Sequence, residues 1–152
     1  MPIDPLATRG YLNNNPGNMD RSDPPWVGEI RNLADCKNDV QRMELEHGRF
    51  CVFVDADHGI RAMVKNLWAY RAIGLDTING LINRWAPPNE NNTIAYKDRV
   101  SLSTGKGLDE HLDMDNRATM RALLDGIIRV ECGGMPYAGS EIENGMTLAG
   151  MT

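Results

Sequence analysis

The sequence predicts a mainly α-helical domain with one small β-hairpin. Apolar residues recur at helical spacing over most of the chain after residue 55, and strand-like alternation is confined to residues 43–54. No set of parallel strands alternates with the helices, which excludes a doubly wound α/β fold. A chain of 152 residues fits one domain, which we place at residues 11–152 after a flexible N-terminal arm at residues 1–10.

The first third of the chain is predicted to be irregular up to the hairpin. Residues 11–18 are rich in Asn, Pro and Gly and are typical of a tight, ordered turn region. Residues 24–29 continue the irregular stretch, and a long segment of this kind in a compact domain is often functional. Alternation at residues 43–46, a turn at His47-Gly48 and a β-prone run at residues 49–54 predict the hairpin.

Helices are predicted over residues 55–74, 76–86, 92–105, 116–132 and 140–149. Their limits follow from capping and breaking residues. Asn92 caps one helix, and Asp115 or Asn116 caps the strongest one. Pro87 and the Gly133-Gly134 pair end the helices that precede them.

Composition excludes several classes of function. The chain has 16 Lys and Arg against 21 Asp and Glu, a net charge of -5, and no basic run, so we expect no nucleic-acid partner. No apolar stretch reaches the roughly 20 residues of a membrane span, and residues 1–10 do not resemble a signal peptide. The three cysteines and three histidines match no metal or redox spacing, so we expect reduced, structural cysteines, no metal and no cofactor.

One carboxylate continues an apolar pattern. In the helix over residues 116–132, the next step of the apolar stripe falls on Glu131, in the last turn before the glycines. The stripe consists of Met120, Leu123, Leu124, Ile127 and Ile128. Partial burial and the negative end of the helix dipole would both raise the pKa of Glu131, as general-acid catalysis requires. The alternative is a frayed helix end with Glu131 in solvent.

Several stretches together resemble a family of small phage proteins linked to cell-wall degradation. They are Arg9-Gly10, residues 13–18, Trp26-Val27-Gly28, Phe50 and Phe53, residues 59–63, residues 76–96, and Ile127-Ile128-Arg129 with Glu131 and Pro136-Tyr137. The chain is similar to virion-associated lysins, including the muralytic structural protein of enveloped double-stranded-RNA phages. The resemblance covers nearly the whole chain after residue 8. One departure is Glu131-Cys132-Gly133, where the family tends to have Glu-Asn-Gly.

The resemblance implies a lysozyme-like fold and peptidoglycan as the substrate. In lysozyme-like enzymes the helix with the catalytic Glu comes before an Asn-containing loop, whereas here the loop comes first. We therefore expect a permuted chain order, which is feasible where the two chain ends lie close together. Asn13, Asn14, Asn15 and Asn18 would then line the sugar cleft, because amides both donate to and accept from sugar groups. The alternative is a turn whose amides only cap neighbouring elements.

The expected activity is cleavage of the glycan strand, as a lytic transglycosylase or a muramidase. Glu131 would protonate the glycosidic oxygen, and Asp20 and Glu29 are the candidates for a second carboxylate. Trp26 and Tyr137 are expected to bind substrate.

Two other functions remain open: a peptidoglycan endopeptidase on the same scaffold, and a non-catalytic virion structural or wall-binding protein. The expected location is the phage virion, or the host cytoplasm before release, with action in the host periplasm and cell wall. Other virion proteins are expected as partners.

Overall fold

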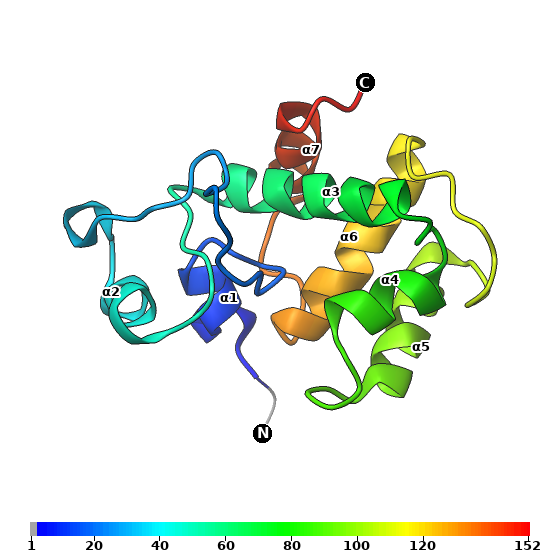
Figure 1. The fold of residues 1–152 in the computed structure, drawn as a ribbon, viewed down its shortest axis with the longest axis horizontal. Coiled ribbons are helices and arrows are strands. Elements are labelled where there is room, and N and C mark those ends of the chain that lie inside the picture. Colours follow the sequence, from blue (N-terminus) through cyan, green and yellow to red (C-terminus); the bar gives the residue numbers. More distant parts are fainter. Residues whose placement is uncertain (1–2) are drawn as a thin grey trace.

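The structure, a computed structural model, describes residues 3–152, and these residues are mainly helical, as the sequence predicts. The α-helices and the two 3-10 helices (η) are arranged around a single main core (Figure 1). In chain order they are η1 Pro5–Ala7, α1 Arg9–Leu12, η2 Leu33–Asp35, α2 Asp39–His47, α3 Ala56–Ala72, α4 Ile78–Trp85, α5 Thr93–Thr104, α6 Arg117–Glu131 and α7 Gly139–Leu148.

The five helices predicted after residue 55 are all present as α3 to α7. The caps predicted for α5 and α6 are formed by the expected side chains. Asn92 accepts a hydrogen bond from the backbone N–H of Ala95 at 3.2 Å, and Asn116 accepts one from Thr119 at 3.0 Å. Each cap satisfies a backbone donor that the first helical turn leaves unpaired.

The predicted hairpin is not formed in the described residues. Residues 43–46 belong to α2, which Asn38 caps by accepting from the N–H of Gln41 at 2.8 Å. Phe50 and Phe53 instead form isolated antiparallel bridges, with Asp20 and Glu29 respectively. Four alternating residues fit one helical turn as well as a strand, and the capped helix prevails because α2 is built mostly from good helix formers.

Residues 4–10 are part of the fold, in contrast to the predicted loose arm. Asp4 caps η1, accepting from the N–H of Leu6 at 3.0 Å, and Thr8 caps α1, accepting from the N–H of Tyr11 at 3.4 Å. Gly10 is buried. The prediction for residues 1 and 2 lies outside the described residues.

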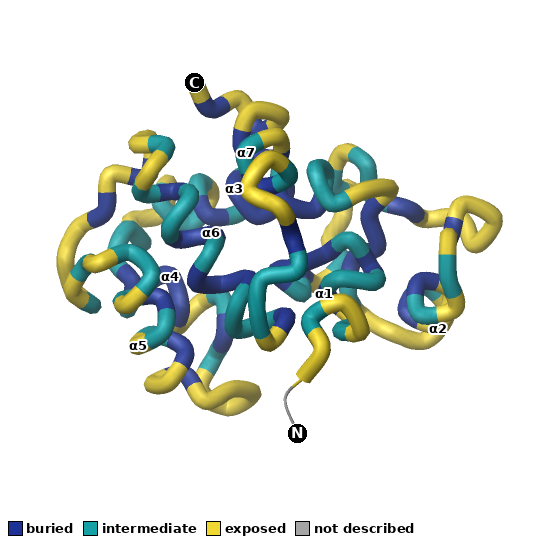
Figure 2. The backbone as a smooth tube through the Cα atoms, turned by 180° about the vertical axis from the view of Figure 1, so that it is seen from behind, coloured by how far each residue is buried: buried dark blue, intermediate teal, exposed yellow. Residues whose placement is uncertain are grey.

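α3 is the longest helix and connects the two sides of the molecule (Figure 1). α2 lies on one side, α4 and α5 lie on the other, and α7 crosses α3. The crossing is close, because a Cβ atom on Gly145 of α7 would lie 2.5 Å from the Ile60 side chain of α3. Figure 2 shows the buried segments gathered along α3, α6 and the loops between them.

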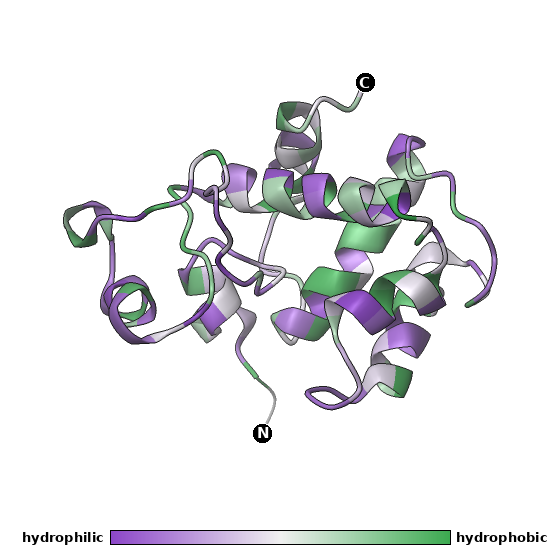
Figure 3. Cartoon of the chain, in the orientation of Figure 1, coloured by the Kyte–Doolittle hydropathy of each residue, from purple (hydrophilic) through white to green (hydrophobic). Residues whose placement is uncertain are grey.

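The helices α3 and α6 carry both polar and apolar residues along their lengths (Figure 3), as expected of helices with one buried face. No helix of residues 3–152 is long and apolar enough to span a membrane. The first and last parts of the described chain lie at opposite edges of the molecule in Figures 1 and 2. Closeness of the chain ends therefore does not support a permuted order.

Candidate active site

Glu131 is the last residue of α6, and it is only partly exposed. The five residues of the apolar stripe that precedes it are fully buried against the rest of the core. The helix ends at the buried Cys132, whose backbone N–H donates to the oxygen of Ile128 at 2.8 Å. Glu131 therefore continues the buried stripe, and the helix end is closed by a backbone hydrogen bond.

Burial raises the pKa of Glu131 from an ordinary value of 4.5 to about 7. Two neighbours oppose this rise: the side-chain amide of Asn18, which hydrogen-bonds to the carboxylate, and the guanidinium group of Arg9. Because the contact with Asn18 favours the ionised form, the amide N–H is its donor. A carboxyl group with a pKa near 7 can both donate and accept a proton at neutral pH.

The loop that carries Asn18 is held by a buried amide. Asn15 is fully buried, and its Nδ2 donates to the backbone oxygens of Met19 and Cys51, each at 3.0 Å. Its Oδ1 accepts from the backbone N–H of Met19, also at 3.0 Å. These three hydrogen bonds replace the backbone pairing that regular structure would provide, so they specify the shape of the loop.

The structure corrects the prediction that all four Asn side chains line a cleft. Asn13 and Asn15 are fully buried, and Asn13 donates to the buried carboxylate of Glu44 at 3.1 Å. Asn14 donates to a backbone oxygen at 3.1 Å. Their amides serve internal contacts, as in the alternative considered for this turn. Asn18 alone of the four lines one of the cavities described below.

That cavity has a volume of about 210 Å³ and combines aromatic with polar walls. Trp26, Tyr70 and Trp85 supply the aromatic part, and Tyr70 meets Trp85 edge-on with ring centroids 6.1 Å apart. Trp85 is fixed further, because its indole N–H donates to the backbone oxygen of Gly17 at 3.2 Å. Apolar walls with a few placed polar groups are typical of small-ligand sites. Asn18 lines this cavity and is also one of the groups that lower the pKa of Glu131.

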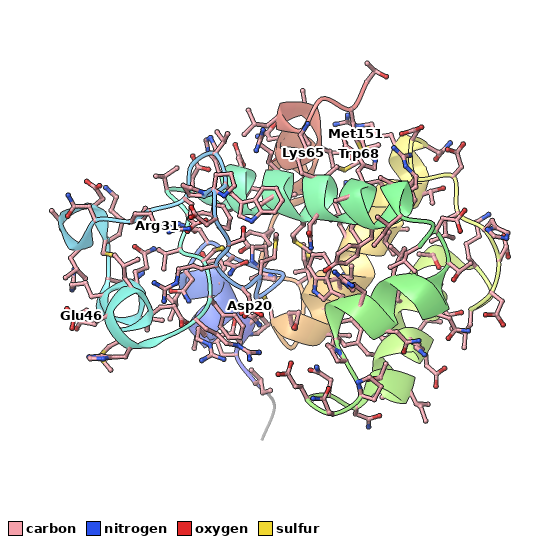
Figure 4. The ribbon with its side chains drawn as sticks, viewed as in Figure 1. Asp20, Arg31, Glu46, Lys65, Trp68 and Met151 are labelled. Carbon is pink, nitrogen blue, oxygen red and sulfur yellow. The ribbon has the colours of Figure 1, made fainter. Side chains whose placement is uncertain are left out.

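The two predicted second carboxylates lie in different surroundings. Asp20 lines the cavity, is mostly exposed, and pairs with the guanidinium of Arg49 at 3.1 Å. It lies near the middle of the molecule, between α2 and the α4–α5 side (Figure 4). The Glu29 side chain is fully buried and is bound by Arg31 and by the backbone N–H of Trp26. Asp20 is therefore the carboxylate of the two that can face a ligand in the cavity.

Two tyrosines complete the surroundings of Glu131 and Cys132. Tyr137, predicted to bind substrate, is buried against Tyr11 with ring centroids 5.5 Å apart and does not line the cavity. Tyr96 of α5 lies close enough to Glu131 for the charge of the carboxylate to raise the pKa of its hydroxyl, although burial raises that pKa more. Neither hydroxyl has a hydrogen-bond partner among residues 3–152.

A known protein places the chain in a family. Protein P5 of Pseudoalteromonas phage PM2 is 34% identical over 143 residues, which cover 91% of this chain and 80% of that protein. The chain belongs to the family of phage protein P5. No family model matches the chain.

The largest of the described cavities in this P5-family protein lies elsewhere. It has a volume of about 580 Å³ and lies between α5, α6 and α7, where Arg117 and Arg121 both contact the carboxylate of Glu143 at 2.7 Å. These ion pairs lower the pKa of Glu143. The carboxylate therefore stays charged and paired with the two guanidinium groups. The smaller cavity at Asn18 is the better candidate, because Asn18 is also a neighbour of Glu131, whose pKa is about 7.

The P5-family chain has three free, buried cysteines and, among its described residues, no group of three or more side chains that could hold a metal ion. Burial raises the pKa of the Cys51 thiol to about 12 and that of the Cys132 thiol to about 11. Neither thiol is a good source of the thiolate that a cysteine nucleophile requires.

The sequence did not predict that these four residues lie around the site: Arg9, Tyr70, Trp85 and Tyr96. Trp85 lies on the apolar stripe of α4, a position typical of a core residue, yet it is only partly buried and lines the cavity. Its position at the end of that stripe, directly before Ala86-Pro87-Pro88, was the available signal. The effect of the Arg9 charge on Glu131 had no local signal, since the two residues lie far apart in the sequence.

Proposed function

We propose that this P5-family protein is a phage lysin that degrades peptidoglycan by cleaving its glycan strand, with Glu131 as the general acid and base. The observation that carries the proposal is the position of Glu131: a carboxyl with a pKa of about 7, next to a residue that lines a cavity with three aromatic rings. A lysozyme-like fold is part of the proposal and rests on the sequence resemblance.

The chemistry begins with protonated Glu131. Its proton passes to the glycosidic oxygen while the bond from that oxygen to the sugar carbon breaks. The resulting carboxylate then removes a proton from the incoming hydroxyl, which is water in a muramidase and the 6-hydroxyl of the substrate in a lytic transglycosylase. Asp20 is the candidate for the second carboxylate of a muramidase, whereas a transglycosylase needs Glu131 alone.

Two features of the cavity support a sugar as its ligand. The rings of Trp26, Tyr70 and Trp85 offer flat apolar surface for the faces of a sugar, and Asn18 and Asp20 add polar groups at the rim. The raised pKa values of Cys51 and Cys132 count against an endopeptidase that uses a cysteine nucleophile.

The proposal is tested on purified peptidoglycan with wild-type protein, Glu131→Gln and Glu46→Gln. Glu46 lies in the last turn of α2, at the outer edge of the molecule (Figure 4), and is a matched control for a glutamate near a helix end. We expect wild type and Glu46→Gln to release glycan fragments, and Glu131→Gln to lose this activity by about 10²-fold or more. Equal release by the Glu131→Gln protein would refute the role of Glu131.

Mass spectrometry of the products separates the alternatives. Anhydromuramic ends identify a transglycosylase, new reducing ends identify a muramidase, and loss of cross-linked dimers without glycan cleavage identifies an endopeptidase. No release by any of the three proteins, with binding retained, supports a wall-binding or structural role instead.

A further inference from the structure

Glu29 is a fully buried glutamate that lines neither of the cavities described above. Its Oε1 atom accepts a hydrogen bond from the backbone N–H of Trp26 at 3.2 Å and lies 3.5 Å from the Sγ atom of Cys51. Its Oε2 atom pairs with the guanidinium group of Arg31. Burying a carboxylate is unfavourable even when it is paired, and an apolar side chain would avoid this cost. A role in holding its partners accounts for the carboxylate, and we refer to Glu29, Arg31 and Cys51 as the carboxylate cluster.

The carboxylate cluster binds the backbone of the loop that forms one wall of the smaller cavity. The guanidinium group of Arg31 donates to the backbone oxygen of Ser22 at 2.7 Å. The thiol of Cys51 lies 3.4 Å from the backbone oxygen of Asp20, and the carboxylate itself binds the N–H of Trp26. All three bound residues of the loop line the cavity. One buried carboxylate is therefore connected, through at most one further side chain, to three residues of the cavity wall.

A turn fixes the backbone on the other side of Trp26. The backbone N–H of Glu29 donates to the oxygen of Trp26 at 3.0 Å and closes a turn over residues 26–29. Gly28, the third residue of this turn, has a φ angle of +81°, which is typical of a type II turn and which glycine adopts without strain. A Cβ atom on Gly28 would lie 2.5 Å from the His58 ring of α3, so the turn packs closely on that helix. Glu29 therefore binds both backbone groups of Trp26, one with its carboxylate and one with its own backbone.

We propose that Glu29 is a positioning residue: through the carboxylate cluster it fixes the loop of residues 20–26 and holds the Trp26 ring as a wall of the cavity. The indole of Trp85 is fixed by its own hydrogen bond to Gly17, whereas the hydrogen bonds that Trp26 makes within the described residues come from its backbone. The place of the Trp26 ring therefore depends on the carboxylate cluster. The inference deepens the proposed function and rests on it only for the identity of the ligand, a peptidoglycan fragment.

The first test follows the Trp26 ring in the free protein and needs no ligand. In ¹H–¹⁵N NMR spectra each tryptophan gives its own indole N–H signal, and Trp26→Phe identifies the signal of Trp26. We expect Glu29→Ala to move this signal toward that of a mobile, solvent-exposed indole, because the loop loses the group that binds it. The signal of Trp68 reports on folding and should stay in place, since its indole N–H donates to the backbone oxygen of Met114 at 3.0 Å.

Glu44 provides a matched control for Glu29. Its side chain is only 3% exposed and pairs with Arg9 at 3.6 Å, so it is a second buried glutamate with an arginine partner. Its carboxylate accepts from the Asn13 amide and from the backbone N–H of Phe50, and neither of these residues lines the smaller cavity. Glu44→Ala and Glu44→Gln therefore remove a comparable buried ion pair, and we expect both to leave the Trp26 signal unchanged.

Glu29→Gln guards against poor folding of Glu29→Ala. Gln has the size of Glu and keeps one oxygen that can accept from the N–H of Trp26. It cannot form the ion pair with Arg31, so the contact of Arg31 with Ser22 loses its support. We expect the Trp26 signal of Glu29→Gln to lie between those of wild type and Glu29→Ala.

The second test measures binding of a soluble peptidoglycan fragment, a disaccharide with its stem peptide, by calorimetry. We expect Glu29→Ala to weaken binding about tenfold, as for loss of one aromatic wall, and Glu29→Gln to weaken it less. The two Glu44 variants should bind as wild type does. Where the protein cleaves glycan, the KM of the Glu29 variants should rise while kcat stays nearly unchanged, because Glu29 does not contact the reacting bond.

The outcomes for Glu29 and for the proposed function can be distinguished. An unchanged Trp26 signal in both Glu29 variants, or equal changes in the Glu29 and Glu44 variants, overturns the role of Glu29. If wild type binds no peptidoglycan fragment, the proposed ligand is wrong, and the Trp26 signal still decides the role of Glu29. If only the Glu29 variants change both the signal and the affinity, the positioning role and the ligand are both supported.

Discussion

Replacing Glu131 by Gln is expected to stabilise the protein at alkaline pH while it abolishes cleavage. The pKa of Glu131 is about 7 in the folded protein and 4.5 when the group is unperturbed. Below pH 4.5 the carboxyl is protonated in both the folded and the unfolded state, so it does not lower the free energy of unfolding. Between pH 4.5 and 7 the folded state holds a proton that the unfolded state has released, so stability falls as pH rises.

The magnitude follows from the size of this pKa difference. At about 1.4 kcal/mol per pKa unit, the free energy of unfolding falls by up to about 3 kcal/mol between pH 4.5 and 7, because of Glu131 alone. Gln at this position carries no charge at any pH and can retain the polar contact with Asn18. The variant should therefore match wild type near pH 4.5 and exceed its stability by up to about 3 kcal/mol at pH 8.

Urea denaturation of both proteins at pH 4.5, 6 and 8 measures this difference. Subtracting the free energy of unfolding of one protein from that of the other removes the contributions of all titrating groups that do not interact with residue 131. If the free energies of unfolding of the wild type and the variant differ by the same amount at all three pH values, Glu131 has an ordinary pKa. That result would refute the reasoning whether or not the variant retains activity.

Three further predictions concern other parts of the structure. Asn15→Ala removes three buried hydrogen bonds and leaves the Cys51 oxygen unpaired, so the free energy of unfolding in urea should fall by roughly 3 kcal/mol. Glu143→Gln breaks partly exposed ion pairs with Arg117 and Arg121, so it should cost less than about 1 kcal/mol at pH 7. Because those pairs lower the Glu143 pKa below 4.5, the difference should disappear as pH falls below that value. Trp26→Ala removes one wall of the cavity and should weaken binding of peptidoglycan fragments about tenfold in calorimetry.

Each of these predictions has an opposing outcome. A loss below about 1 kcal/mol for Asn15→Ala would mean that the loop is not specified by that amide. If the stability difference between wild type and Glu143→Gln grows toward low pH, the ion pairs of Glu143 do not stabilise the folded protein. Unchanged fragment binding by Trp26→Ala would place the sugar elsewhere.

The helix that ends in Glu131 was predictable because its information is local. The cap at Asn116, the apolar stripe and the glycines after Cys132 lie within one short stretch of sequence, and each acts over a few residues. The same holds for the limits of α3, α4 and α5.

Features that depend on contacts across the chain were not predictable. Asn13 and Asn15 have the same amide chemistry whether they bind a sugar or fix a loop, and only the packing around residues 19, 44 and 51 decides between these roles. Residues 43–46 satisfy both the strand and the helix period, because four residues are too few to separate them. The cap at Asn38 was the local feature that favoured the helix.

The surroundings of Glu131 are built from segments that lie far apart in the sequence, and this sets when the site can form. The thiol of Cys132 contacts the backbone oxygen of Pro16 across 116 positions, and Arg9 and Asn18 act on Glu131 over comparable distances in the chain. Proteins are synthesised from the N-terminus, at about 5–20 residues per second, so the loop with Asn18 leaves the ribosome many seconds before α6. A chain interrupted before α6 has the loop and the aromatic wall but lacks Glu131. The proposed site can therefore be complete only after translation has passed the last long helix.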